Sequence, residues 1–406
     1  MGESLTVATP WYPAPNHPFG GAFVRDKVEA VAPLFTDVNV YHVEDWPLPK
    51  EPLVGRIDRR KVDELLLKEG PAAPVTPERR GPATVTRIPA PIRAGRFYAE
   101  YARAHEHAVR TILRGRRLPA EVVHGHVGIY GGWVACQLAQ PGARVFVTEH
   151  ATFLNHILRQ PDAREMYRDV VARCTAFFCV SEVLRKQLAE AFPEHAGKLY
   201  VVPNAVRVEE IPFRPEPVTE IRRWLYVGSF SERKGVRWLL EAFGVCALEN
   251  RDLELTMVGG GPLHDELARR VAQLGLQDRV RLLGPVPPEE VTGYLHSHDV
   301  LVHLSRYETF GMTVVEALAS GIPVIVTRCG GPEETLSGIE HVAGEFVPVV
   351  DGVVEIVEAY RRLASRVDEL DLVTARKSIE ERYGFAAVRE QLAQFYFGAL
   401  PAPQEV

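Results

Sequence analysis

The sequence predicts an α/β protein made of two Rossmann-like, doubly wound domains. Its 406 residues are too many for one typical domain and suit two. Short apolar runs alternate with longer amphipathic segments along the whole chain, as in parallel sheets built from βαβ units. A proline-rich stretch near the middle interrupts this alternation, which then starts again.

Six apolar runs in the first half have the length and bounding residues of buried strands. They are Leu5–Ala8, Val38–Val43, Glu121–Val123, Arg144–Thr148, Ala176–Val180 and Leu199–Val202. Helical patterns lie between them, including Ala22–Leu34 and Glu182–Ala191. The stretch from Glu44 to Ala94 is rich in Pro, Gly and Arg and has little periodicity, so we expect a long loop inserted over one face.

Three closely spaced prolines, Pro212, Pro215 and Pro217, predict a linker over residues 207–221 between a domain of residues 1–206 and one of residues 222–384. The second domain has its own alternation of strands and helices. The expected strands are Trp224–Val227, Leu253–Val258, Val280–Leu283, Val300–Leu304 and Pro323–Val326. The expected helices are Val236–Leu248, Pro262–Leu274 and Gly311–Ser320.

Two doubly wound domains should leave a cleft that the carboxyl ends of their strands face. A last helix over Phe385–Leu400 has no strand to follow it. One interpretation is that residues 385–406 cross back and pack on the first domain.

Composition favours an ordinary globular protein, with 46% hydrophobic and 25% charged residues. No apolar run has the length of a membrane span, and the first residues lack a basic-then-apolar leader. The five cysteines are odd in number, scattered and without metal-site spacing. They are best read as buried free thiols in a reducing compartment, so a cytoplasmic protein is expected.

Charge is unevenly distributed along the chain. The net charge is −6, yet residues 55–117 contain fifteen Lys or Arg against seven Asp or Glu. Such a stretch can attract phosphate, an acidic glycan or anionic lipid, and contact with the inner face of a membrane is one hypothesis. In that hypothesis Arg59, Arg60, Arg79 and Arg80 dock the anionic surface. The alternative is a solvated arginine-rich surface.

The segment VGSFSERKG, residues 227–235, places two adjacent cations where a strand gives way to a helix. Gly228 ends the strand, and Arg233 and Lys234 precede a helix that begins at Val236. Glycine lets a phosphate approach the backbone, and paired cations can neutralise a diphosphate leaving group. A charged surface loop would have the same composition, so this segment alone leaves both interpretations open.

The run ETFGMTVVE, residues 308–316, ends the turn after another strand and enters a helix near Gly311. The free N–H groups at a helix start can bind anionic or hydroxyl oxygens. Glu308 lies at the mouth of this turn. Glu316 lies more than a turn into an apolar helix, where we expect a buried carboxylate that ribose hydroxyls would satisfy. A Glu bonded to nearby backbone is the alternative.

Two further glycine turns follow strands, in MVGGGPLHDEL (residues 257–267) and CGGPEETL (residues 329–336). Neither is a GxGxxG fingerprint, and neither carries a Walker lysine. A nicotinamide cofactor and P-loop hydrolysis are therefore not indicated.

Together these motifs resemble the family 4 retaining glycosyltransferases, which have the GT-B fold. The most specific signature is the Glu-x7-Glu pattern in ETFGMTVVEALASGIPVI. The segments with Lys234-Gly235, GGGP, GPVPPEEV and CGGPEE fall in the family's order and spacing. Looser matches lie in the first half: WYPAPNHPFGGAFV, VVHGHVGIYGG, VTEHATF, CVSEVLRKQL and VVPNAV.

The resemblance implies transfer of a sugar, with retention, from a nucleotide diphosphate sugar to a hydroxyl of a glycan, a lipid-linked sugar or a small natural product. It implies neither a cofactor nor a metal, because arginine and lysine carry the positive charge, and no nucleic-acid partner is expected. The implied catalytic residues are His150, Arg233, Lys234 and Glu308. The implied donor-binding residues are Gly20, Gly21, Gly228, Ser229, Gly260, Phe310, Gly311, Met312, Thr313 and Glu316.

His126 is implied on the acceptor side, whereas His303 lies in a strand and should be packed. One departure concerns Ser229, because the family often has Arg at this position, and Arg233 is the expected substitute. Three rival interpretations remain: a catalytically silent nucleotide-sugar-binding subunit, a nucleotide-sugar 2-epimerase and a phosphorylase. An epimerase would lack the ETFGMTVVE pattern, and a phosphorylase would be longer.

Overall fold

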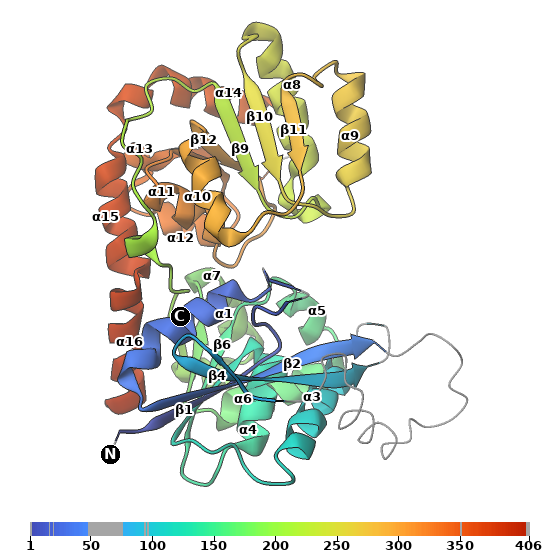
Figure 1. Cartoon of the computed structure of the whole chain (residues 1–406), viewed down its shortest axis with the longest axis vertical. Helices are drawn as coiled ribbons and strands as arrows, with labels where there is room; N and C mark the ends of the chain where they lie inside the picture. Colours follow the sequence, from blue (N-terminus) through green and yellow to red (C-terminus); the bar gives the residue numbers. More distant parts are fainter. Residues whose placement is uncertain are drawn as a thin grey trace, which may run out of the picture. The chain divides into compact units, whose positions relative to one another are not determined.

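A computed structural model describes residues 2–15, 17–18, 20–47, 76–92, 95, 97–349 and 351–402. The chain divides into two compact units. Unit 1 consists of residues 1–205 and 388–406, and unit 2 consists of residues 206–387. Each unit contains its own parallel sheet with helices on both faces (Figure 1).

Among the described residues, the sheet of unit 1 has eight strands in the order β3-β4-β2-β1-β5-β6-β7-β8. Neighbouring strands run parallel, except that β3 is antiparallel to β4. The strands are β1 (Ser4–Thr9), β2 (Asp37–Pro47), β3 (Glu78–Arg80), β4 (Ala83–Ile92), β5 (Val122–His126), β6 (Arg144–Glu149), β7 (Ala176–Cys179) and β8 (Leu199–Val201).

The helices of unit 1 are crossover connections between these strands, apart from the last, α16, which follows unit 2. They are α1 (Ala22–Val31), α3 (Tyr98–Ile112), α4 (Trp133–Leu138), α5 (Leu154–Leu158), α6 (Pro161–Arg173), α7 (Glu182–Ala191) and α16 (Phe385–Phe397). A π-helical turn, Val127–Gly132, connects β5 to α4.

The last helix, α16, completes the core of unit 1, so the interpretation that it crosses back is confirmed. Tyr396 is fully buried, and its hydroxyl lies 2.6 Å from Nδ1 of His124 on β5. The Gln391 amide donates a 2.8 Å hydrogen bond to the carbonyl of Val201 on β8. In Figure 1 this red helix lies beside the first blue elements of the chain.

The expectation of a loop over residues 44–94 is wrong where the structure describes them. β2 continues to Pro47, and β4 pairs with it in parallel over nine residue pairs. Pro89 and Pro91 hid this strand, because proline removes a donor from a sheet. Beyond Val85, β4 pairs with β2 alone among the described strands, so both prolines occupy an edge that needs no donor. Residues 48–75 lie outside the described residues.

Among the described residues, the sheet of unit 2 has six parallel strands in the order β11-β10-β9-β12-β13-β14. They are β9 (Arg223–Val227), β10 (Glu254–Val258), β11 (Val280–Leu283), β12 (Val300–His303), β13 (Val324–Thr327) and β14 (Gly344–Val347). The helices are α8 (Val236–Glu249), α9 (His264–Gln273), α10 (Pro288–His296), α11 (Met312–Ala319), α12 (Gly331–Leu336), α13 (Glu340–Ala343), α14 (Val354–Ser365) and α15 (Leu372–Tyr383).

The proline-rich segment over residues 207–221 packs within unit 2. Val218 and Ile221 are buried in the same apolar cluster as Trp224. The amide of Arg214 donates a 3.0 Å hydrogen bond to the carbonyl of Ser320. The segment is therefore part of the second compact unit.

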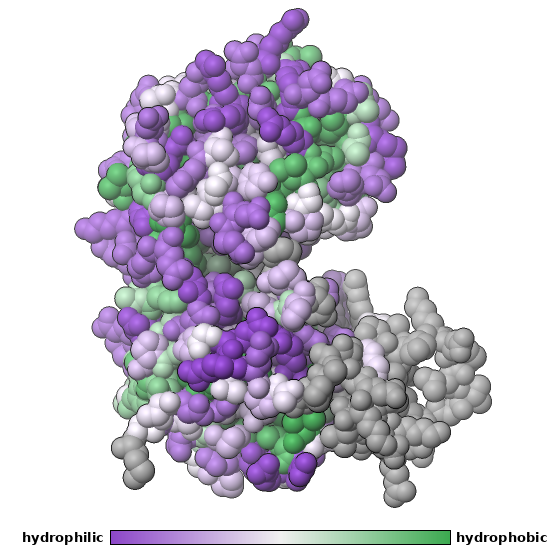
Figure 2. Space-filling model, in the orientation of Figure 1, coloured by the Kyte–Doolittle hydropathy of each residue, from purple (hydrophilic) through white to green (hydrophobic). Residues whose placement is uncertain are grey.

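The surface in Figure 2 is largely hydrophilic over both units, with small separate apolar areas. The most exposed large apolar side chains, Leu248, Val373 and Val354, lie on three different helices of unit 2. Within the described part of the chain, no helix is both long enough and apolar enough to cross a membrane.

Candidate functional site

The strand order of unit 2 reverses between β9 and β12, which lie side by side at its centre. The chain leaves β9 toward β10 and β11 on one side, and leaves β12 toward β13 and β14 on the other. Loops at such a switch point diverge and leave room for a ligand at the carboxyl ends of the strands. The motifs around residues 228–235 and 304–311 are these two loops.

Three charged side chains predicted from the sequence meet at this edge. Glu308 Oε1 accepts a 2.9 Å hydrogen bond from Arg233 Nη1 and a short contact from Lys234 Nζ. Ser305 Oγ donates to the same oxygen at 2.9 Å. Arg233 also donates to the carbonyl of Tyr307 at 2.8 Å. Two cations and one carboxylate leave one net positive charge facing a site whose expected ligand is a diphosphate.

Glu308 stays ionised although it is only 6% exposed. Burial raises the pKa of its carboxyl, but the neighbouring His303, Lys234 and Arg233 outweigh burial and hold that pKa well below its usual range. His303 is buried, as expected, with Nε2 3.6 Å from Glu308 Oε1. Burial lowers the pKa of His303, so its ring is neutral at pH 7.

Glycines bring the site's loops into backbone contact. At Gly235, where φ is +65°, a Cβ would lie 2.1 Å from the carbonyl oxygen of Leu304 at the end of β12. A Cβ at Gly259 would lie 1.9 Å from the carbonyl oxygen of Gly228. At the predicted donor residue Gly260, a Cβ would have only ordinary contact with Pro285. A Cβ at Gly261, where φ is +148°, would lie 2.6 Å from the carbonyl oxygen of Phe230, so Gly259 and Gly261 carry the packing requirement in GGGP and Gly260 between them does not.

Helix α11 begins at Met312; its N-cap residue is Gly311, whose φ of +92° is left-handed, and no side chain caps its first turn. Phe310 is buried, with its ring 5.2 Å from that of Tyr383 on α15. Met312 and Thr313 are half-buried at the start of the helix. The uncapped first amides keep the capacity to bind an oxygen anion.

Glu316 differs from the expectation, because it is half-buried and not buried. It lies on α11 one turn beyond Met312, and its carbonyl accepts hydrogen bonds from both the amide and the hydroxyl of Ser320. Ser229 is exposed, with Oγ 3.1 Å from Oγ of Ser231. Neither observation tests the predicted donor contacts.

In unit 1 the corresponding loops follow β1 and β5. A Cβ at Gly21, where φ is +71°, would lie 2.4 Å from the backbone carbon of Trp11, so this position requires glycine. Gly20 is exposed and lines a hollow that begins beside Trp11. Both glycines thus lie in the loop where the sequence placed them.

Three imidazoles form a buried stack at the ends of β5 and β6. The rings of His124 and His126 are 4.5 Å apart, and those of His126 and His150 are 5.1 Å apart. His126 Nδ1 lies 2.8 Å from His150 Nε2, so the two predicted histidines are hydrogen-bonded to each other. Burial holds the pKa of all three well below the usual range, so the stack is uncharged at pH 7.

Glu149 is a buried carboxylate that the sequence reasoning missed. It accepts hydrogen bonds from the Tyr167 hydroxyl at 2.6 Å and from the amides of Gly128, His150 and Ala151 at 3.0, 2.8 and 2.8 Å. Burial raises its pKa, and these donors act against that rise. The carboxylate fixes the backbone that carries His150. The signal was present in the sequence as a Glu inside the apolar strand end VTEH.

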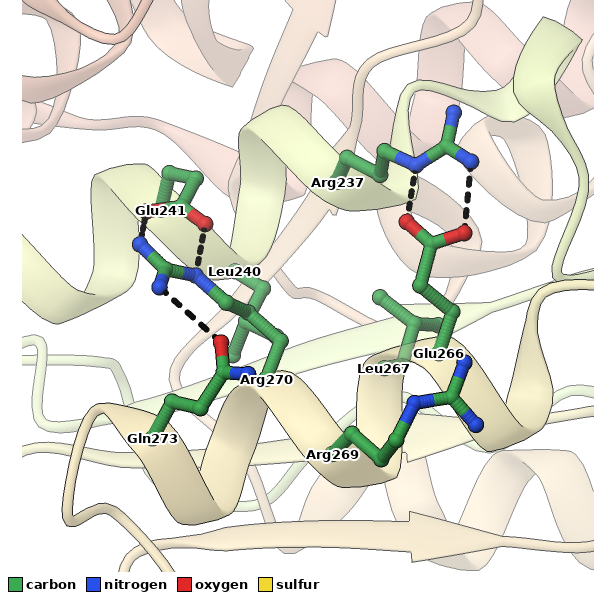
Figure 3. A pocket seen from close by; sticks show the side chains of 8 residues that line it. All are labelled: Arg237, Leu240, Glu241, Glu266, Leu267, Arg269, Arg270 and Gln273. Carbon is green, nitrogen blue, oxygen red and sulfur yellow. Dashed lines mark hydrogen bonds and ion pairs between the residues drawn. The ribbon is translucent and has the colours of Figure 1, made fainter.

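A hollow between α8 and α9 is closed by ion pairs (Figure 3). Glu241 accepts two hydrogen bonds from Arg270, at 2.5 and 2.8 Å, and Glu266 is held in the same two-pronged way by Arg237. Each pair joins one helix to the other. These side chains satisfy one another, so the hollow is a helix-packing feature.

Only part of the basic stretch over residues 55–117 lies in the described chain. Arg79 and Arg80 are exposed on β3, and Arg80 forms an ion pair with Glu78 at 2.9 Å. Arg59 and Arg60 lie outside the described residues. No cluster of His, Cys, Asp and Glu that could hold a metal ion occurs among the residues the structure describes.

Two family models match consecutive parts of the chain. Residues 53–210 match "Glycosyltransferase Family 4", and residues 221–366 match "Glycosyl transferases group 1". Among solved structures, a sucrose-phosphate synthase from Thermosynechococcus elongatus superposes with a TM-score of 0.74 at 19% identity, covering 97% of this chain and 98% of the other. The Anabaena protein HepE in complex with UDP superposes with a TM-score of 0.67 at 14% identity, over 97% and 99% of the two chains. These likenesses show the fold, and both superpositions cover nearly all of this chain.

Curated relatives match at lower coverage. The GPI3 subunit of phosphatidylinositol N-acetylglucosaminyltransferase from Saccharomyces cerevisiae is 24% identical over 71% of this chain and 65% of its own length. An alpha-monoglucosyldiacylglycerol synthase from Streptococcus pneumoniae is 25% identical over 49% of each chain. An N-acetyl-alpha-D-glucosaminyl L-malate synthase from Bacillus anthracis is 24% identical over 69% of this chain and 75% of its own. This chain thus spans less than two thirds of the length of the first two of these relatives.

Proposed function

Because this chain belongs to the family 4 retaining glycosyltransferases of GT-B fold, we propose that it transfers a sugar from a nucleotide diphosphate sugar to an acceptor hydroxyl without a metal ion. The observation that carries the proposal is the meeting of Arg233 and Lys234 on buried Glu308 at the switch point of unit 2.

The proposed chemistry is electrostatic. When the nucleoside diphosphate leaves the anomeric carbon, negative charge grows on its phosphate oxygens. Arg233 and Lys234 already lie together, so they stabilise that charge without reorganisation. The free amides at the start of α11 add positive dipoles at the same edge.

In this proposal, the donor diphosphate replaces Glu308 as the ion-pair partner of Arg233 and Lys234. Without donor, Glu308 neutralises part of the charge on both cations. A diphosphate takes over the cations, and the Glu308 carboxylate then accepts hydrogen bonds from hydroxyls of the transferred sugar. The acceptor attacks from the face that the leaving group vacates, and a phosphate oxygen takes its proton.

The Glu316 carboxylate is the proposed contact for the ribose. It lies on the same helix whose start would hold the phosphate, about one turn further along. Contacts of His150, His126, Gly20, Gly228, Ser229 and Gly260 with donor or acceptor remain predictions.

A panel of radiolabelled nucleotide sugars, beginning with UDP-glucose and UDP-N-acetylglucosamine, tests the proposal. UDP comes first because the Anabaena neighbour was solved with it. We expect slow release of sugar from one donor without acceptor, undiminished by excess EDTA. A chain that binds a nucleotide sugar but never consumes it would instead be the silent subunit. Activity that disappears in EDTA and returns with manganese would overturn the metal-independent account.

A further inference from the structure

Unit 1 contains a cavity of about 490 Å³, and of its lining residues only Gly20 has a predicted role above. It lies between the loop that follows β1 and the last residues of β2. Its lining includes Trp11, Tyr12, His42, Glu44, Asp45 and Trp46. Sites for small molecules typically have volumes of about 300–1,000 Å³ and combine apolar walls with a few polar groups.

The sheet register places this cavity at the carboxyl edge of unit 1. β1 and β2 run parallel, with Thr9 opposite His42, so the chain that leaves β1 and the chain that extends β2 start from the same level. β2 continues past β1 because it pairs with β4 as far as Pro47. The extension carries Glu44, Asp45 and Trp46 beyond the end of β1.

One buried polar atom in the lining has no partner. His42 is 4% exposed, and its Nδ1 makes no hydrogen bond with any described residue. The nearest carboxylate oxygen, Oε1 of Glu44, is 3.7 Å away, too far for a hydrogen bond. Burial lowers the pKa of His42 to about 4, so the ring is neutral at pH 7. A buried atom of this kind usually has a partner in the functional state, and a ligand or an ordered water can supply it.

The polar groups of the cavity can both donate and accept. Glu44 and Asp45 accept hydrogen bonds when ionised, and a neutral imidazole can do either. A hydroxyl also does both, whereas an ammonium only donates and a phosphate only accepts. Trp11 and Trp46 are half-buried and supply apolar ring faces beside these groups.

We propose that this cavity binds an uncharged sugar or cyclitol ring of the acceptor, with one face of the ring against tryptophan and its hydroxyls bonded to Glu44 and His42. The proposal rests on the proposed function and names the class of its acceptor. A phosphorylated ring is disfavoured because it would place an anion beside two carboxylates, and the nearby Arg87 is already paired with Glu78 at 3.2 Å. Asp45 is already held by His105, whose Nε2 lies 2.7 Å from Oδ1.

Saturation-transfer NMR on the full-length protein without donor tests the site directly. The probes are methyl α-glucoside, methyl α-mannoside, myo-inositol, glucose 6-phosphate and glucosamine, each at millimolar concentration. We expect transfer to at least one neutral ring and none to the phosphate. Trp46→Ala should weaken that binding about tenfold, the loss of about 1.4 kcal/mol. Phe97→Ala is the matched control, because Phe97 is an exposed aromatic residue of unit 1 outside the lining.

A charge-neutralising arm sharpens the test. The double variant Glu44→Gln, Asp45→Asn should begin to bind glucose 6-phosphate while keeping the same fold by circular dichroism. UDP binding, measured in parallel on every variant, is the control for the donor site around Arg233 and Lys234. Binding of only the phosphate or only glucosamine would overturn the proposal, as would binding to no neutral ring while UDP still binds. Consumption of a nucleotide sugar by the unmodified protein is measured separately. If the protein consumes a donor but its cavity binds no neutral ring, the acceptor-site proposal fails and the proposed function stands.

Discussion

The carboxyl edges of the two sheets are both built from parallel strands, but their electrostatics differ. In unit 2, Glu308 stays ionised because Arg233 and Lys234 contact its carboxylate. In unit 1, three stacked histidines are neutral, and the buried Lys27 forms no ion pair with any described residue. Burial favours the neutral form of an isolated group, whereas paired charges survive it. The edge of unit 2 suits a charged ligand, and the edge of unit 1 suits uncharged hydroxyls.

The largest expected effect concerns Lys27, whose pKa burial lowers to about 7. Below pH 7 both folded and unfolded chains hold the proton, so the folded state bears the full burial cost. Between pH 7 and the unfolded value of 10.5 the unfolded chain binds more protons, so the free energy of unfolding rises with pH. Lys27→Met should therefore be more stable than the unmodified protein at pH 6. This advantage should shrink by up to about 4 kcal/mol by pH 10.

Urea unfolding from pH 6 to 10 measures that difference. Lys377→Met, on the exposed face of α15, should follow the unmodified protein at every pH. A pH-independent difference for Lys27→Met would mean that the lysine is charged throughout. The edge of unit 1 would then not be the neutral counterpart of the edge of unit 2.

The charged edge is tested by Arg233→Ala and Lys234→Ala. Both remove charge that matters most as the diphosphate leaves, so turnover should fall about a hundredfold or more, with a smaller loss of donor binding. Arg237→Ala is the control, because Arg237 pairs with Glu266 on the surface of the same unit. Steady-state kinetics together with circular dichroism give the answer. A fully active Lys234→Ala variant would show that the donor phosphate does not bind at this site.

Substitutions of the two signature glutamates, Glu308 and Glu316, should change different kinetic parameters in the same assay. Glu316→Gln should raise the Michaelis constant for donor about tenfold and largely keep turnover, since a ribose contact is equally strong in ground and transition states. Glu308→Gln should lower both turnover and donor binding, because its carboxylate holds the cations and, in the proposed site, would face the reacting sugar. Equal kinetic changes in both variants would contradict these separate roles.

The smallest expected effect comes from Arg–Glu pairs outside the site. Arg270 and Glu241 join α9 to α8 through two hydrogen bonds, yet both side chains remain substantially exposed to water. A double-mutant cycle with Arg270→Ala and Glu241→Ala should give a coupling of about 0.2–1 kcal/mol and unchanged turnover. A larger coupling, or a loss of activity, would place this hollow closer to the chemistry than its geometry suggests.

Sequence periodicity predicted both sheets because their central strands are short, apolar and bounded by turns. It failed at β4, where Pro89 and Pro91 occupy an edge, and at β14, whose sequence GEFV has too few apolar residues to read as a strand. Strand edges and ends depend on pairing partners, which a local pattern does not contain.

The charged site followed from the sequence because cations and carboxylate flank glycine turns at strand ends. The cavity of unit 1 did not, because β2 was expected to end at Val43. Its lining residues Glu44, Asp45 and Trp46 were therefore assigned to a loop. Glu316 was expected to be buried from its apolar neighbours, but one face of α11 remains open.

The return of α16 to unit 1 has a consequence for synthesis. Unit 2 is one continuous segment, whereas unit 1 needs Tyr396 and Phe395, made after all of unit 2, to cover Phe146 and Phe178. On the ribosome, unit 2 can therefore acquire its core while unit 1 still lacks part of its own. A nascent chain halted before residue 388 would expose aromatic surface on its first-made half, and chaperones bind surface of that kind.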